Sequence, residues 1–191
     1  MYPELAIREL VANAIIHQDF SITGTGPMIE IFSDRLEITN PGVPLVDPRR
    51  FLDTPPRSRN EALASLMRRM GICEERGSGF DKVVFQTELF QLPPPKIEVS
   101  EIHTKVILFA YKKFAAMDRE EKIYATYLHS CLKYVNREAM TNQSLRERFG
   151  IEDKNSAQAS RIINDTIGEE LIKRENPEGS KKYSKYVPFW A

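Results

Sequence analysis

Three polar side chains near the start of the chain stand four residues apart. They are Glu9, Asn13 and His17, and they fall within residues 4–17, whose apolar side chains recur with the period of a helix. On such a helix all three share one edge. A carboxylate there can orient or deprotonate a water molecule, and an amide oxygen suits Mg²⁺, an ion that also binds phosphates. On spacing alone, the simpler interpretation is a polar helix edge that faces water.

Two glycine-containing turns follow later in the chain. The first, residues 40–42 (Asn-Pro-Gly), closes a predicted strand, and the second, residues 77–79 (Gly-Ser-Gly), precedes a predicted helix. A glycine turn that leads into a helix presents backbone N–H groups and the positive end of the helix dipole to an anion. The order of these three features indicates a phosphate-binding site more strongly than any one of them alone.

The elements that must position these groups follow from the hydrophobic pattern. In the first part of the chain the pattern predicts helices at residues 4–17, 61–70 and 80–89, strands at 28–32, 36–39, 96–100 and 105–110, and a loop or lid at 43–59. In the second part it predicts helices at 118–135, 141–149 and 156–170, then strands at 171–174 and 181–188. The expected fold class is α+β, with an α/β sandwich in residues 1–113 and a winged helix-turn-helix domain in residues 114–191.

The same pattern predicts how two of the helices pack. Asn60 is expected to cap the helix that follows it. The apolar faces are expected to be Ile7, Leu10, Val11, Ala14 and Ile15 in the first helix, and Leu63, Leu66, Met67 and Met70 in the second.

Four segments carry a family resemblance, and they occur in order within residues 1–112: RELVANAIIHQDFS, IFSDRLEITNPG, SRNEALASLMRRMG and EERGSGFDKV. Together they resemble the GHKL nucleotide-binding fold of gyrase, MutL and histidine kinases. They are most similar to the divergent GHKL-like domain of RecG-like proteins and predicted transcriptional regulators, which commonly carry a Schlafen AlbA-type domain upstream. The resemblance implies binding of ATP or ADP with Mg²⁺, and the helix that starts almost at residue 1 suggests a fragment that lacks such an upstream domain.

The resemblance also assigns roles to single residues. Glu9 matches the glutamate that is catalytic where these domains hydrolyse ATP, and Asn13 matches the Mg²⁺ ligand. The nucleotide contacts would come from Asn13, Asn40 in place of an adenine-reading aspartate, Gly42, Gly77, Ser78 and Gly79.

Two departures from the family pattern argue against efficient hydrolysis. Asn40 lacks the charge of an aspartate, and Pro44, which cannot donate a backbone hydrogen bond, stands in place of a glycine. No lysine matches the lid residue that grips phosphate, although Arg57 and Arg59 could serve. We therefore expect an ATPase activity that is weak or absent, and no helicase activity, since the sequence has no Walker A pattern.

The helices and hairpin predicted after residue 114 have the order of a winged helix-turn-helix. The outward face of its third helix would carry base-reading and phosphate-binding side chains, and the hairpin would supply basic residues for the DNA backbone. The candidate DNA-binding residues are Ser156, Gln158, Ser160, Arg161, Asn164, Lys181, Lys182 and Lys185. Asp165, Glu169 and Glu170 weaken the positive field there, and winged helices also serve as protein-binding modules.

Composition narrows the function classes without choosing among them. The formal net charge is zero, so DNA binding must depend on a local basic patch. The two cysteines and three histidines are scattered, which favours a reducing, cytoplasmic setting without a metal cluster, and no apolar run is long enough to span a membrane. The favoured function is a homodimeric transcriptional regulator that binds double-stranded DNA and responds to a nucleotide effector. The alternatives are a degenerate scaffold or interaction module, and a weak ATPase in DNA processing.

Overall fold

The computed structural model describes residues 2–55, 57–73, 79–178 and 184–191. The chain forms two compact units. Unit 1 comprises Met1–Phe90 and Pro95–Ala110, and unit 2 comprises Gln91–Pro94 and Tyr111–Ala191. The chain therefore enters unit 2 for four residues, returns to unit 1 and enters unit 2 again after Ala110. Among the described residues, no helix has the length and apolar character that a membrane crossing requires.

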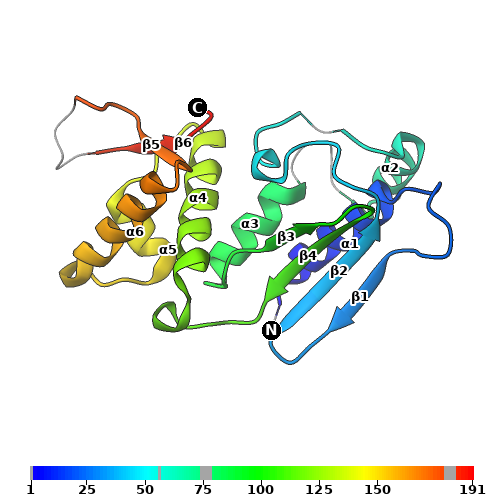
Figure 1. The fold of residues 1–191 in the computed structure, drawn as a ribbon, viewed down its shortest axis with the longest axis horizontal. Helices are drawn as coiled ribbons and strands as arrows, with labels where there is room; N and C mark the ends of the chain where they lie inside the picture. Colours follow the sequence, from blue (N-terminus) through cyan, green and yellow to red (C-terminus); the bar gives the residue numbers. More distant parts are fainter. Residues whose placement is uncertain (1, 56, 74–78, 179–183) are drawn as a thin grey trace. The chain divides into compact units, whose positions relative to one another are not determined.

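Unit 1 is a mixed α/β structure built on one antiparallel sheet, as the sequence predicts (Figure 1). Its four strands lie in the order β1-β2-β4-β3, and each neighbouring pair is antiparallel. The described elements are α1 (Glu4–His17), β1 (Met28–Ile31), β2 (Arg35–Pro41), η1 (Pro48–Arg50), α2 (Glu61–Arg69), α3 (Gly79–Leu89), β3 (Lys96–Val99) and β4 (His103–Phe109). The helices α1 and α3 pack against each other, and α1 also packs against β2.

The strand β2 is longer than the sequence predicts. Asn40 and Pro41 were expected to break it, but they stay paired with Thr104 and His103 of β4. The strand ends at Pro41 and is followed by Gly42, whose φ of +104° disfavours any other residue. Because side chains alternate along a strand, this extension places Asn40 on the same face as Ile38.

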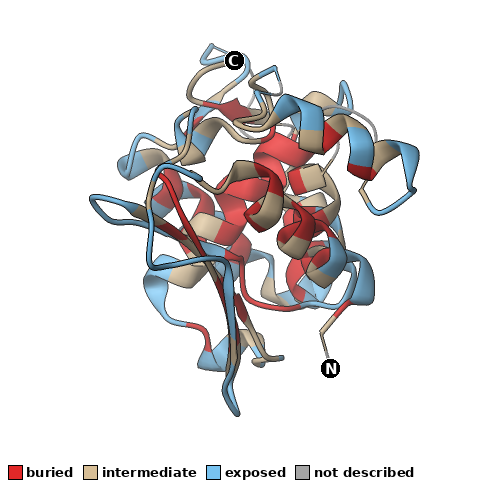
Figure 2. Ribbon diagram, turned by 90° about the vertical axis from the view of Figure 1, so that its right-hand side faces the viewer, coloured by how far each residue is buried: buried red, intermediate tan, exposed pale blue. Residues whose placement is uncertain are grey.

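The burial of α1 differs from the predicted single stripe. The side chains of Ile7, Val11 and Ile15 are only partly buried. Leu10 and Ala14 are buried as predicted, and Ala6, Glu9, Ala12 and Ile16 are buried as well. The reason is that β2, α2 and α3 all pack on α1, so that its burial extends around the helix (Figure 2 shows the buried residues concentrated in the helical core).

The packing of α2 confirms part of the predicted face, because Met67 is buried and Leu63 packs beside it, and corrects the rest. Leu66 and Met70 are 45% and 65% exposed, whereas Ala64 and Met67 are buried against α1. Asn60 makes no side-chain cap on α2. Its Nδ2 donates instead to the carbonyl oxygens of Ile16 (2.9 Å) and Gln18 (2.8 Å), so it satisfies the end of α1.

Unit 2 has three longer helices followed by a two-stranded antiparallel sheet, in the predicted order. Its described elements are η2 (Phe114–Ala116), α4 (Arg119–Val135), α5 (Asn142–Phe149), η3 (Asp153–Asn155), α6 (Ser156–Gly168), β5 (Ile172–Arg174) and β6 (Tyr186–Pro188). The residue types of Asp118 and Thr141 predict helix N-caps, and Gly150 is predicted to end the second helix. All three are confirmed, because Asp118 and Thr141 each form a capping box and Gly150 ends α5 with φ of +63°.

Helical spacing in the sequence predicts that the core of unit 2 is formed by Leu145 and Phe149 from one helix and by Ala159, Ile163 and Ile167 from the next. Leu145 and Phe149 of α5 are buried, as are Ala159 and Ile163 of α6. Ile167 was expected beside them but is only partly buried. Ile162 and Thr166 are buried as well, so the buried face of α6 is broader than the predicted one.

Candidate functional site

Unit 1 contains a cavity of about 200 Å³ between α1, the sheet and the loop that follows β2. The polar edge of α1 faces it, since Glu9, Asn13 and His17 all line the cavity. Asn40 of β2 and Gly79 at the start of α3 line it too. The fold thus brings together residues that are up to 70 positions apart in the chain, counted from Glu9 to Gly79.

The first residue of α3 lies directly against the polar edge of α1. A Cβ built on Gly79 would stand 3.2 Å from Glu9 Oε2 and 3.6 and 3.8 Å from the Asn13 Nδ2 and Oδ1 atoms. Any larger residue at this position would therefore press on both side chains. Two other candidates from the glycine turn, Gly77 and Ser78, lie outside the described residues.

Asn13 is a polar side chain on the cavity wall. Its side chain makes no hydrogen bond or ion pair with any residue that the structure describes. The Glu9 carboxylate is 2% exposed, and its Oε1 lies 3.6 Å from Arg8 Nη2. Described residues form no group of three or more His, Cys, Asp or Glu side chains that could hold a metal. This donor set fits Mg²⁺, which takes few protein ligands and completes its shell with phosphate oxygens and water.

The sheet end of the cavity pairs two buried polar side chains. Asn40 and Thr104 stand opposite each other on β2 and β4 and are 7% and 8% exposed. Asn40 Nδ2 donates to the Pro41 carbonyl oxygen (3.0 Å), and Thr104 Oγ1 donates to the Gly42 carbonyl oxygen (2.7 Å). Both side chains keep an acceptor oxygen, so this end suits a flat ring with a polar edge. Sequence patterns alone could not single out Thr104, because its place depends on the register of β2 against β4.

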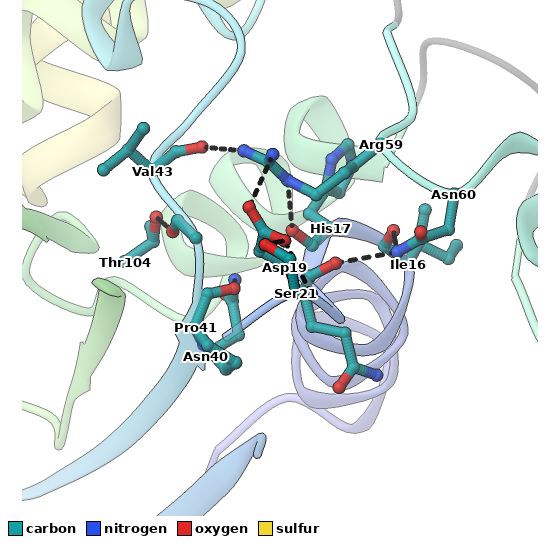
Figure 3. A network of polar contacts seen from close by, with 12 residues as sticks. Ile16, His17, Asp19, Ser21, Asn40, Pro41, Val43, Arg59, Asn60 and Thr104 are labelled. Carbon is teal, nitrogen blue, oxygen red and sulfur yellow. Dashed lines mark hydrogen bonds and ion pairs between the residues drawn. The ribbon is translucent and has the colours of Figure 1, made fainter. Parts of the chain in front are cut away.

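A polar network anchors the loop after β2 to the end of α1 (Figure 3). The Arg59 guanidinium donates to the His17 carbonyl oxygen (3.1 Å), the Asp19 carboxylate (3.2 Å) and the Val43 carbonyl oxygen (2.7 Å). Burial and the nearby Arg59 charge lower the pKa of His17, so its ring is neutral at neutral pH. Hydrogen bonds from Ser21, and less strongly the Arg59 charge, lower the pKa of Asp19. Arg59 is thus engaged in holding the loop.

In unit 2 the candidate DNA-binding residues of α6 are all exposed: Ser156, Gln158, Ser160, Arg161 and Asn164. Ser160 Oγ also accepts a hydrogen bond from Asn142 Nδ2 (2.9 Å), which ties α6 to α5. Lys185 is exposed just before β6, whereas Lys181 and Lys182 lie outside the described residues. Arg119 of α4 pairs with Glu169 (3.0 Å) and Asp165 (4.0 Å), which partly neutralises the acidic groups at the end of α6.

Comparison with known proteins supports part of the family resemblance. Residues 24–108 match the family described as "Putative ATP-dependent DNA helicase recG C-terminal". The matched stretch holds Asn40, Gly42 and Gly79, begins after α1, and takes from unit 2 only Gln91–Pro94.

A solved structure resembles a larger part of the chain. The crystal structure of the DIP2311 protein from Corynebacterium diphtheriae aligns with a TM-score of 0.55 and 19% sequence identity over 84% of this chain. The chain spans 36% of the length of that protein, and the likeness concerns the fold alone. A search of curated proteins found no match. The matches therefore support a divergent GHKL-like, ATPase-type domain in unit 1.

Proposed function

We propose that unit 1 binds ATP or ADP, together with Mg²⁺, in the cavity between α1 and the sheet. One observation carries this proposal: Glu9 and Asn13 of α1, Asn40 of β2 and Gly79 of α3 come from three separate elements and line the same cavity. The residues proposed to handle phosphate and metal lie together where α3 begins against α1. The acceptors suited to a purine, on Asn40 and Thr104, lie on the sheet.

Each group has a role that its chemistry suits. The Asn13 amide oxygen would hold Mg²⁺, which would neutralise phosphate charge when bound. The start of α3 would direct backbone N–H groups and the helix dipole to the phosphates. Asn40 Oδ1 and Thr104 Oγ1 would accept hydrogen bonds from the exocyclic amine of adenine or from a water beside it.

The nucleotide in this proposal acts as an effector, with little or no turnover. The Glu9 carboxylate that would activate water is 2% exposed, and its Oε1 lies 3.6 Å from Arg8 Nη2, so the Arg8 guanidinium competes with a water molecule for it. Pro44 lines the cavity where a glycine N–H would contact the ligand.

For unit 2 we propose a winged helix that binds double-stranded DNA through the outer face of α6. The proposal is supported by the order of three helices and an antiparallel strand pair, and by the exposure of Gln158, Arg161 and Asn164 on one helix. These side chains can read base edges in the major groove. The whole chain would then act as a transcriptional regulator, as a homodimer on a palindromic site.

Isothermal calorimetry with ATP, ADP and a non-hydrolysable ATP analogue, each with Mg²⁺, tests the nucleotide site. We expect micromolar binding that falls at least tenfold in Asn13→Ala. The matched control is Glu4→Ala, on the exposed face of the same helix, which should bind as the wild type does. If the wild type binds no nucleotide, unit 1 is a scaffold and the proposal is wrong.

Selection from a random duplex library followed by fluorescence anisotropy tests the DNA site. Arg161→Ala should lose preference for the selected sequence over a scrambled one. Lys133→Ala removes a positive charge of α4 that is paired with Glu138 (2.7 Å) and is not a candidate DNA contact, and should keep that preference. Equal preference in Arg161→Ala and the wild type would remove Arg161 from the DNA contact.

A further inference from the structure

Two arginines on the cavity wall differ from neighbouring arginines in their lack of an acidic partner among the described residues. Arg57, in the loop before α2, and Arg68, on α2, both line the cavity. Within the part of the chain that the structure describes, neither side chain makes a hydrogen bond, an ion pair or a ring contact. Nearby, by contrast, Arg49 pairs with Asp47 and Arg50 pairs with Asp53.

The charges on the cavity wall are unbalanced toward the positive side. Of the described residues that line the cavity, Glu9 is the one carboxylate, and it already lies 3.6 Å from Arg8. His17 is neutral because its pKa is lowered. Arg57 and Arg68 therefore have no acidic partner among the described residues of the wall, and a bound anion would supply one. A guanidinium group presents a planar fork of N–H donors that matches phosphate oxygens.

Both arginines are carried by segments that are tied to α1. Arg68 belongs to α2, which packs on Ala12 and Ile16 of α1 through Ala64 and Met67. These contact residues stand on either side of Asn13 in the sequence of α1, so α2 packs on the same part of that helix. Arg57 stands two residues before Arg59, which bonds to the end of α1.

We propose that Arg57 and Arg68 bind the terminal phosphates of the nucleotide, so that the cavity selects polyphosphates over the monophosphate. The inference rests on the proposed nucleotide site and adds the residues that set its phosphate selectivity. The sequence analysis named both Arg57 and Arg59 as candidates for phosphate binding. In this proposal Arg59 anchors the loop, and Arg57 contacts the ligand. Arg68, which the sequence did not single out, supplies the second cation.

The test measures the affinities of Mg-ATP, Mg-ADP and AMP for Arg57→Ala and Arg68→Ala by calorimetry. Each substitution should weaken ATP binding by about tenfold, as expected for the loss of one charge-assisted hydrogen bond, and AMP binding by less than about twofold. The matched control is Arg69→Ala, the exposed neighbour of Arg68 on α2 that does not line the cavity. It should leave all three affinities unchanged.

Conservative variants guard against a loss of folding. Arg57→Lys and Arg68→Lys keep the charge and should recover part of the ATP affinity, while thermal unfolding checks that each variant is folded. Equal losses for ATP and AMP, or no loss for ATP in either alanine variant, would overturn the inference while the nucleotide site stands. Absence of nucleotide binding by the wild type would instead refute the proposed function, and the phosphate assignment with it.

Discussion

Replacing Gly79 by alanine should weaken nucleotide binding with little effect on stability. The new Cβ would lie 3.2 Å from Glu9 Oε2, which is tighter than an ordinary contact, and 3.6–3.8 Å from the amide of Asn13. The methyl group would therefore take up the space in front of the two side chains proposed to handle Mg²⁺ and water. Glu9 is 2% exposed and has little room to withdraw.

Two opposing effects on stability nearly cancel. Gly79 begins α3 with a φ outside the positive range, so alanine fits the backbone and gains up to about 1 kcal/mol in helix propensity. Crowding by one extra methyl group costs about 1 kcal/mol when the neighbours must shift by a few tenths of an ångström. The net change in the free energy of unfolding should stay within about 0.5 kcal/mol. The shift forced on the Glu9 carboxylate, together with the methyl group that fills the space in front of the Asn13 amide, should cost Mg-ATP affinity about tenfold, the low end of the loss seen when the support of a metal ligand is removed.

Gly71→Ala is the matched control with the opposite result. Gly71 follows α2 with φ of +68° and has no atom within 4 Å of a built Cβ. Alanine there is strained but touches nothing, so stability should fall by about 1 kcal/mol, or roughly 4 °C in the melting temperature, at unchanged Mg-ATP affinity. Calorimetry and thermal unfolding of both variants give the four numbers needed. Wild-type affinity in Gly79→Ala would refute the assignment of this corner of the cavity to the nucleotide.

Three further predictions concern stability. Burial raises the pKa of Asp81 to about 6 from its ordinary 3.8, so between these pH values the folded state holds a proton that the unfolded state has lost. The free energy of unfolding should therefore fall as the pH rises from about 4 to about 7. Denaturant titrations across this range should show a flatter pH profile for Asp81→Asn than for the wild type. Asp118→Ala removes the capping box of α4 and should cost about 1 kcal/mol in urea unfolding, against no change for Glu120→Ala. Arg148 is 5% exposed and donates to the Leu92 carbonyl oxygen (2.7 Å), so Arg148→Ala should lower the free energy of unfolding by about 2–3 kcal/mol. A loss below about 0.5 kcal/mol, within the error of such titrations, would contradict this.

The sequence predicted the elements well because their signals are local. Asp118 and Thr141 cap the helices that directly follow them, and Gly150 ends a helix with the left-handed backbone that glycine favours. Each signal acts within a few residues, so a reading along the chain finds it. The polar edge of α1 is equally local, and Glu9 and Asn13 do line one cavity.

The packing of the helices and the partners of Asn60 could not be predicted, because they depend on contacts between distant segments. On α2 the large apolar residues suggested the packed face, but the helix approaches α1 through the small Ala64, and Leu66 stays exposed. With Ala64 and Met67 facing α1, Arg68 lies on the cavity wall. Helical periodicity alone could not predict this position. Asn60 is a residue type that caps helices, and sequence cannot tell whether it serves its own helix or the end of another.

The register of β2 against β4 determines what the cavity presents at its sheet end. Side chains alternate between the two faces, so a slip of one residue would turn Thr104 away from Asn40 and point Lys105 into the cavity. On the opposite face, Glu37 is 6% exposed and accepts from Arg35 Nε (2.6 Å) and from Lys105 Nζ (2.5 Å). Lys105 and then Arg35 lower the pKa of Glu37, so this buried carboxylate remains charged and needs both partners. A slip would break the Glu37–Lys105 pair, and Glu37 therefore acts as a positioning residue for a site that it does not touch.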